Sequence, residues 1–199
     1  GSLGFVVNAP PIVAIANPVT GAKYTPGSVL TLQVNTSDVD GVVGRVEFWQ
    51  NGEKLGEDIE PPFTYIVNNL NSGPYIYAAK AYDNFGASST SSPVAVIVNA
   101  PPNLSFQNPT KDTTILRSTP LTVRLNANDP DGEIIRVELY LNDIKVGEDG
   151  QPPYAITLNN LPLGTHKLKA ITWDDVDEVK ESKVINLTVS TMTATQDIK

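Results

Sequence analysis

Residues 8–11 read Asn-Ala-Pro-Pro, and the same four residues return at 99–102. The chain continues to match itself at this spacing of 91 residues without a gap. The matches are Asp38-Val39-Asp40-Gly41 with Asp129-Pro130-Asp131-Gly132, Arg45-Val46-Glu47 with Arg136-Val137-Glu138, Gly56-Glu57-Asp58 with Gly147-Glu148-Asp149, Pro61-Pro62-Phe63 with Pro152-Pro153-Tyr154, and Asn68-Asn69-Leu70 with Asn159-Asn160-Leu161. Solenoid repeats are shorter, about 20–50 residues, whereas small domains span about 50–200. The repeat therefore predicts two related domains.

The repeat also predicts the domain boundaries. We expect domain 1 over residues 8–98 and domain 2 over residues 99–189. Residues 1–7 form a leader whose Gly1-Ser2 is typical of an expression remnant, and the polar residues 190–199 are expected to be a frayed tail. Two prolines in residues 99–102 predict a short and stiff linker, because proline fixes φ.

Apolar and polar residues alternate through most of each repeat, as in residues 29–36 and 75–82. A period of two predicts strands with one face on a core, and no stretch shows a helical period. Turn signals such as Asp40-Gly41 and Asn51-Gly52 separate the strands. The predicted strands are 12–16, 28–36, 43–50, 53–57, 63–68, 75–82 and 88–98, and their equivalents 91 residues later. About seven short strands per domain predict an all-β chain of two tandem immunoglobulin-like β-sandwiches.

The first repeat also resembles a known family. The residues concerned are Ser37-Asp38-Val39-Asp40-Gly41, Arg45-Val46-Glu47-Phe48-Trp49-Gln50-Asn51-Gly52, Leu55-Gly56, Pro61-Pro62-Phe63 and the stretch from Gly73 to Gly86. They resemble the bacterial Ig-like domains found in tandem in secreted and cell-surface proteins, often beside polysaccharide-degrading enzymes. The resemblance implies an extracellular spacer or adhesion element that contacts neighbouring domains of its own polypeptide, or alternatively a carbohydrate-binding accessory module. Domain 2 departs from the pattern at Asp177-Glu178, in place of Gly86-Ala87, so its last turn is expected to differ.

Composition excludes several classes of function. The net charge of −8 argues against nucleic-acid partners and anionic membrane surfaces. No apolar run is long enough to insert into a membrane, and the absence of cysteine excludes disulfides. The one histidine, His166, aligns with Tyr75, where immunoglobulin folds often carry a tyrosine that bonds back to the backbone. We therefore expect a monomeric, non-catalytic protein in which His166 makes that structural bond, although a glycosidase with paired carboxylates stays open.

Acidic residues occur in two loops that an immunoglobulin-like sandwich brings to the same end, one after residues 28–36 and one after residues 75–82. Ca²⁺ takes roughly 6–8 oxygen ligands, so this end of each domain is a candidate calcium site that would stiffen an adhesin. Alternatively, these side chains form Asx turns that accept backbone N–H groups. The candidate ligands are Asp38, Asp40, Asp83 and Asn84 in domain 1, and Asp129, Asp131, Asp174, Asp175 and Asp177 in domain 2, with Asn99 or Asn103.

Aromatic residues lie at outward positions of two neighbouring strands. If Val46 and Phe48 point inward, Trp49 points outward, and the same parity turns Tyr82 outward. Trp49 and Tyr82 could then lie side by side as a platform for a polysaccharide, as could Tyr140 and Trp173 in domain 2. The alternative is a cross-strand aromatic pair that only stabilises the sheet. The recurring pairs Arg45/Glu47 and Arg136/Glu138 are interpreted as exposed ion pairs of little energetic weight.

Overall fold

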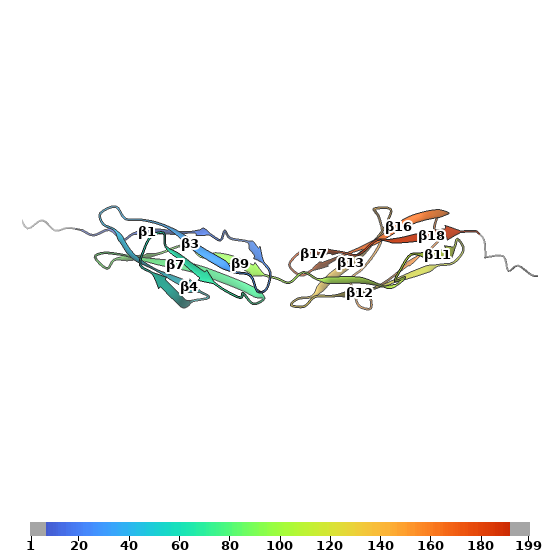
Figure 1. Cartoon of the computed structure of the whole chain (residues 1–199), viewed down its shortest axis with the longest axis horizontal. Helices are drawn as coiled ribbons and strands as arrows, with labels where there is room; N and C mark the ends of the chain where they lie inside the picture. The colour runs from blue at the N-terminus through green and yellow to red at the C-terminus, as the bar shows by residue number, and fades with distance from the viewer. Residues whose placement is uncertain (1–6, 192–199) are drawn as a thin grey trace, which may run out of the picture. The chain divides into compact units, whose positions relative to one another are not determined.

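The computed structural model describes residues 7–191 and divides into two compact units, residues 1–99 and 100–199. We call them domain 1 and domain 2 and describe each by itself (Figure 1). The expected leader, residues 1–7, and the expected tail, residues 190–199, lie largely outside the described residues. All regular elements within 7–191 are strands, and no helix there could span a membrane. The all-β, two-domain prediction is confirmed.

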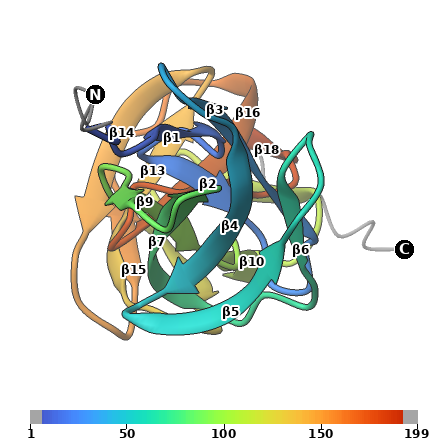
Figure 2. The same ribbon diagram turned by 90° about the vertical axis from the view of Figure 1, so that its left-hand side faces the viewer.

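Domain 1 is a sandwich of two sheets. The smaller sheet has the order β1-β3-β6, and the larger has the order β2-β9-β7-β4-β5 with β8 added to β7. Figure 2 shows β5 beside β4, at the edge of the larger sheet. The strands are β1 Ile12–Asn17, β2 Ala22–Tyr24, β3 Leu30–Ser37, β4 Val43–Gln50, β5 Glu53–Asp58, β6 Thr64–Val67, β7 Gly73–Asp83, β8 Ser88–Thr90 and β9 Val94–Val98.

Domain 2 repeats this topology. Its sheets have the orders β10-β12-β15 and β11-β18-β16-β13-β14, with β17 added to β16. The strands are β10 Asn103–Asn108, β11 Thr113–Leu116, β12 Leu121–Asn128, β13 Ile134–Leu141, β14 Ile144–Asp149, β15 Ala155–Leu158, β16 Gly164–Asp174, β17 Val179–Glu181 and β18 Ile185–Ser190.

The core of each domain lies between its two sheets and follows from the alternation. In β3, Leu30, Leu32 and Val34 are buried, whereas the residues between them are exposed. Across the sandwich they face the inner side of β4 and β7, where Val46 and Phe48 are fully buried. Each fully buried aliphatic or aromatic side chain contributes about 1.5–3 kcal/mol to folding. Separate clusters of this kind fill the two domains, so each has its own core.

The strand predicted over residues 88–98 is in fact two strands, β8 and β9. Between them the hydroxyl Oγ of Ser91 accepts the backbone N–H of Ala79 at 3.0 Å, while the N–H of Ser91 donates to the carbonyl of Ala79 at 2.8 Å. A side chain thus replaces a backbone partner, and the strand breaks without leaving Ala79 unpaired. Ser182 makes the same two bonds with Ala170 in domain 2.

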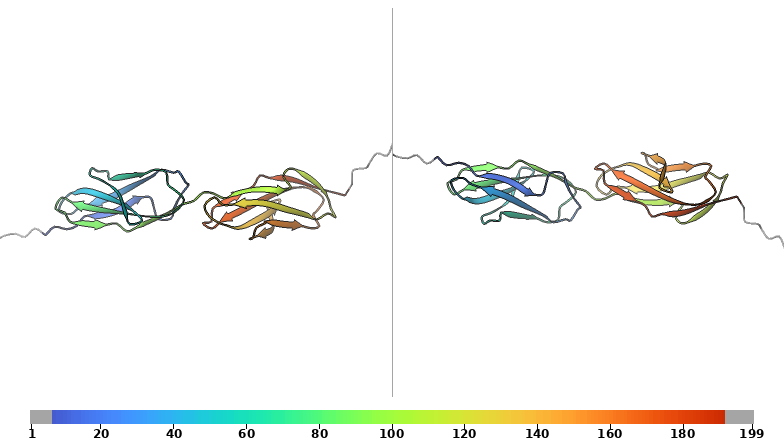
Figure 3. Two further views of the ribbon diagram at one scale, coloured as in Figure 1. Left: turned by 90° about the horizontal axis from the view of Figure 1, so that it is seen from below. Right: turned by 90° about the horizontal axis from the view of Figure 1, so that it is seen from above.

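A short strand near the beginning of each domain was not predicted. β2 pairs in parallel with β9, and β11 pairs in parallel with β18. In each domain this early strand therefore runs in the same direction as the last strand. Because of this, the chain enters the domain at one end and leaves it at the other. The path through each domain can be followed by its colour in the two views of Figure 3.

His166 makes the structural bond expected of it. Its Nε2 lies 2.8 Å from the carbonyl oxygen of Pro162, as the hydroxyl of Tyr75 lies 2.9 Å from the carbonyl of Asn71. If Nε2–H donates to that carbonyl, the neutral ring leaves Nδ1 to accept from Asn142 Nδ2 at 2.9 Å.

Candidate functional site

The loop after β3 places its aspartates against backbone amides. Asp38 Oδ1 accepts the N–H groups of Asp40 and Gly41, each at 3.1 Å, which is an Asx turn. Asp40 Oδ2 accepts the N–H of Ala9 at 2.9 Å. Domain 2 repeats the arrangement, with N–H donors from Asp131 and Gly132 to Asp129 and from Ala100 to Asp131.

The loop after β7 uses its acidic residue in the same way. Asp83 Oδ1 accepts the N–H groups of Phe85 at 2.9 Å and Ala87 at 2.8 Å, and its Oδ2 accepts from Asn8 Nδ2 at 2.7 Å. Burial alone would raise the pKa of Asp83, but these hydrogen bonds outweigh it and hold the pKa below its ordinary value. In domain 2, Asp174 Oδ1 accepts from Val176 and Glu178 at 3.0 and 2.6 Å.

The next residue of that loop joins the two loops. Asn84 Oδ1 accepts the N–H of Val42 at 3.1 Å, and Asp175 Oδ1 accepts the N–H of Glu133 at the same distance. Gly41 makes this approach possible, because a Cβ there would lie 2.5 Å from Asn84 Oδ1. The predicted candidates from both loops are therefore brought to one end of each domain.

The last turn of domain 2 does not differ as expected. Asp177 adopts a positive φ of 60°, as Gly86 does at 94°, and both turns close with the same backbone hydrogen bonds. Aspartate is one of the few non-glycine residues that enter this region readily. The substitution therefore changes the charge of the loop and keeps its shape.

The acidic end has some features of a cation site and lacks others. No group of three or more His, Cys, Asp or Glu side chains among residues 7–191 is placed to hold a metal ion. Two carboxylate oxygens there, Asp38 Oδ2 and Asp129 Oδ2, are nevertheless buried without a hydrogen-bond partner. Burial, followed by the proximity of Asp131 and Asp174, raises the pKa of Asp129. Asn103 is exposed at the start of β10, and the backbone N–H of Asn99 donates to Tyr24 at 2.8 Å.

The predicted side-by-side placement of the aromatic rings is wrong. Tyr82 lies opposite Arg45, whereas Trp49 lies opposite Ala78, which is four residues before Tyr82 in β7. At about 3.3 Å per residue this separates the two positions by about 13 Å. Tyr140 and Trp173 are separated in the same way, because they lie opposite Lys169 and Arg136.

Between the two aromatic positions lies a glutamate that was expected to be exposed. Glu47 is only 7% exposed on the outer face of the larger sheet. Its Oε1 accepts from Lys54 Nζ at 2.9 Å and lies 3.7 Å from Arg45 Nη2, and its Oε2 accepts from the hydroxyl of Tyr82 at 3.2 Å. The guanidinium of Arg45 in turn lies 3.8 Å from the centroid of the Tyr82 ring, a cation–π contact. The carboxylate is thus covered by its own partners.

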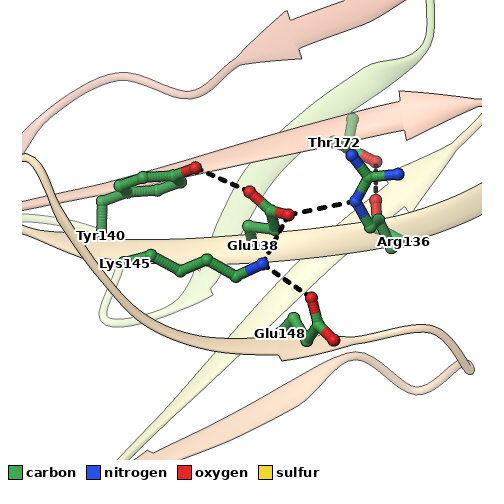
Figure 4. Close-up of polar contacts among 6 residues, drawn as sticks. All are labelled: Arg136, Glu138, Tyr140, Lys145, Glu148 and Thr172. Carbon is green, nitrogen blue, oxygen red and sulfur yellow. Dashed lines mark hydrogen bonds and ion pairs between the residues drawn. The ribbon is translucent and has the colours of Figure 1, made fainter. Parts of the chain in front are cut away.

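Domain 2 holds the equivalent carboxylate more closely, as Figure 4 shows. Glu138, 6% exposed, accepts from Lys145 Nζ at 2.7 Å, Arg136 Nε at 3.0 Å and the Tyr140 hydroxyl at 2.6 Å. Burial opposes ionisation, but these contacts outweigh it and lower the pKa of Glu138 to about 2. Burial would raise the pKa of Glu47 as well, but the contacts with Lys54, Tyr82 and Arg45 outweigh it and leave that pKa below its ordinary value.

The tyrosine and the tryptophan have exchanged places between the domains. In domain 1 the tyrosine that reaches the glutamate comes from β7, and in domain 2 it comes from β13. The tryptophan of domain 2, Trp173, takes the position of Tyr82 and lies beneath Arg136, at 4.1 Å. One hydroxyl and one arginine–aromatic contact are kept in both domains. The alignment of the repeats carried this signal, since Trp49 matches Tyr140 and Tyr82 matches Trp173.

Residues 11–91 and 102–170, one stretch in each sandwich, match a family model described as bacterial Ig domain. The chain belongs to the bacterial Ig domain family. Bacterial Ig domains are typically non-catalytic structural modules of extracellular or surface proteins, and Ig-like domains generally mediate contacts with other domains or ligands.

One of the similar solved structures, with a TM-score above 0.5, agrees with this assignment of fold. Fibronectin(III)-like modules of Clostridium thermocellum CbhA are 23% identical over 89% of this chain and 94% of theirs, with a TM-score of 0.51. Three N-terminal domains of the bacteriophage RB49 outer capsid protein Hoc are 7% identical over 92% of this chain and 71% of theirs, with a TM-score of 0.49. No curated protein matches the chain.

Proposed function

We propose that these two bacterial Ig domains form a non-catalytic spacer that separates or presents neighbouring domains of a secreted or surface protein. The observation that carries this proposal is the parallel pairing of β2 with β9 and of β11 with β18. A chain that enters a domain at one end and leaves at the other adds the length of that domain to the polypeptide. A module whose termini met at one end would add almost none.

The same pairing suits a module under tension. Force applied to the two ends of domain 1 acts along β2 and β9, so their hydrogen bonds are loaded together rather than one after another. Three residue pairs join these strands, from Ala22–Val96 to Tyr24–Val98. Four pairs join β11 and β18 in domain 2. This favours a load-bearing spacer in a surface protein.

An exchange in the protein that carries this pair tests the proposal. Deletion of residues 8–189 should abolish presentation of the neighbouring domain, and an unrelated Ig-like pair of equal length should restore it. Failure of the unrelated pair to restore presentation, with both proteins exported equally, would contradict a spacer role and favour a specific ligand.

A calcium-stiffened adhesin is the second candidate, favoured by the buried, unpartnered oxygens Asp38 Oδ2 and Asp129 Oδ2. A cation could partner such oxygens, although the neighbouring carboxylates already accept backbone N–H groups. A site filled at 100 times its Kd adds about 2.7 kcal/mol to the free energy of unfolding. Thermal melting with calcium and with a chelator measures this difference, and equal midpoints would exclude the site.

A further inference from the structure

Domain 1 carries a groove on the outer face of its larger sheet that none of the preceding assignments uses. The groove has a volume of about 350 Å³, at the small end of ligand sites, which span about 300–1,000 Å³. It is lined mainly by apolar atoms, and Ile76 at its side is 53% exposed. Its lining residues are Trp49, Gly52, Ile76, Ala78, Lys80 and Thr90.

The indole of Trp49 presents carbon to this groove. Its Nε1 is buried and has no hydrogen-bond partner, so the N–H is not offered to a ligand. Ala78, directly opposite Trp49 in β7, leaves the space beside the ring open because it has only a methyl group. An aromatic ring next to an open apolar floor suits the C–H face of a sugar ring, whose hydroxyls then point to the rim.

One cation borders the groove without a carboxylate partner. Lys80 makes no ion pair with any residue in the range 7–191, and its nearest ring contact is Tyr82, 4.9 Å from Nζ to the centroid. Glu47 lies opposite Lys80 in the register, but its oxygens accept from Lys54 and Tyr82. Lys80, one of the lining residues, therefore has no carboxylate partner among residues 7–191, and its Nζ lies on the side toward Tyr82.

In domain 2 a lysine side chain fills the position of this groove, and two acidic residues neutralise its charge. Lys169 replaces Ala78, and its Nζ lies 3.2 Å from Glu181 and 3.9 Å from Asp143. Those two acids stand where domain 1 has Thr90 and Gly52. In domain 2 this part of the outer face is therefore covered by ion pairs. In domain 1 it is an open apolar groove bordered by a lysine. Structural need alone does not explain that difference, because both domains fold around the same inner face.

We propose that the groove of domain 1 binds a pyranose unit that carries a carboxylate, as in polysaccharides of uronic acids. Trp49, Ile76 and Ala78 receive the apolar face of the ring, and Lys80 pairs with the carboxylate. Charge complementarity selects this occupant over a neutral sugar, and the groove is too small for a folded partner. The proposal goes beyond the spacer role and does not depend on it.

Nuclear magnetic resonance titration with oligogalacturonate, in chelator to exclude calcium bridging, tests the proposal. We expect shifts at the indole N–H of Trp49 and at the amides of Ala78, Lys80 and Thr90, with a Kd in the millimolar range. The fully methyl-esterified oligomer has the same ring without the charge. It should bind about three- to fivefold more weakly, the weight of one exposed ion pair. Absence of shifts at these residues, or equal affinity for the ester, would overturn the proposal.

Grafting the residues of domain 2 provides a variant that keeps Trp49. The triple change Gly52→Asp, Ala78→Lys and Thr90→Glu should fill the groove and abolish the shifts. Asp143 already adopts a positive φ of 65° at the position of Gly52, at 85°, so the graft is compatible with the turn. Lys80→Gln should weaken binding of the acid to the level of the ester. The exposed Lys111→Gln removes one charge elsewhere and should change nothing. Retained binding by a triple variant with an unchanged melting midpoint would refute this site.

Discussion

Domain 1 and domain 2 share an inner face and differ on the outer face of the larger sheet. Inside, the same positions of β4 and β13 are buried, as with Val46 and Val137. Outside, each domain buries a glutamate but places the tyrosine that reaches it on a different strand. One face is left as an apolar groove and the other is covered by ion pairs. The two repeats therefore share the buried residues of the inner face that folding requires, and they differ on the outer face.

The largest expected effect comes from the shared inner face. Phe48 is fully buried and stacks on Tyr65 with ring centroids 5.6 Å apart. Phe48→Ala should cost domain 1 about 3–5 kcal/mol, because it leaves a cavity. Calorimetry should show one transition moved down and the transition of domain 2 unmoved. An equal shift of both transitions would contradict two separate cores.

The exchange of tyrosine and tryptophan can be reproduced within domain 1. Tyr82→Trp alone removes the hydroxyl that donates to the buried Glu47, which should cost about 1–3 kcal/mol. Adding Trp49→Tyr supplies the hydroxyl from the position that Tyr140 has in domain 2, and should recover most of the loss. Denaturant unfolding of both single variants and the double variant measures this coupling. Additive losses would show that the two positions do not share the glutamate.

Lowering the pH should destabilise domain 2 through Glu138. The pKa of Glu138 is about 2 in the folded domain, against an ordinary 4.5, so its stabilisation is complete above pH 4.5 and is lost as the pH falls toward 2. We expect about 1–2 kcal/mol, allowing for solvent screening of the exposed Lys145. Glu138→Gln should flatten this dependence in domain 2, as seen in melting midpoints between pH 6 and 2, whereas the domain 1 midpoint should follow the wild-type curve. An unchanged acid dependence would exclude Glu138 as its source.

Alternation predicted the strands from 12–17 to 73–83 well because one face of each meets the core. It could not predict β2, which has three residues, or the break at Ser91, which depends on a side-chain hydroxyl meeting Ala79 across the sheet. Parity placed Glu47 outward correctly. It could not show the burial of that carboxylate, because its cover comes from Lys54 on the neighbouring strand and from Tyr82. The order of the predicted strands placed the acidic residues at one end of each domain. Their backbone N–H partners could not be predicted, because these depend on the geometry of the loops.

Single-molecule force spectroscopy on the two-domain chain tests the spacer proposal most directly. Each domain should unfold in one step that releases about 90 residues, or roughly 300 Å of extended chain at about 3.3–3.6 Å per residue. Domain 2, with four parallel pairs against three, should unfold at the higher force, and domain 1 can be recognised by the lowered force of Phe48→Ala. Unfolding of both domains at the low, sequential forces of a sheet that unzips would contradict the account.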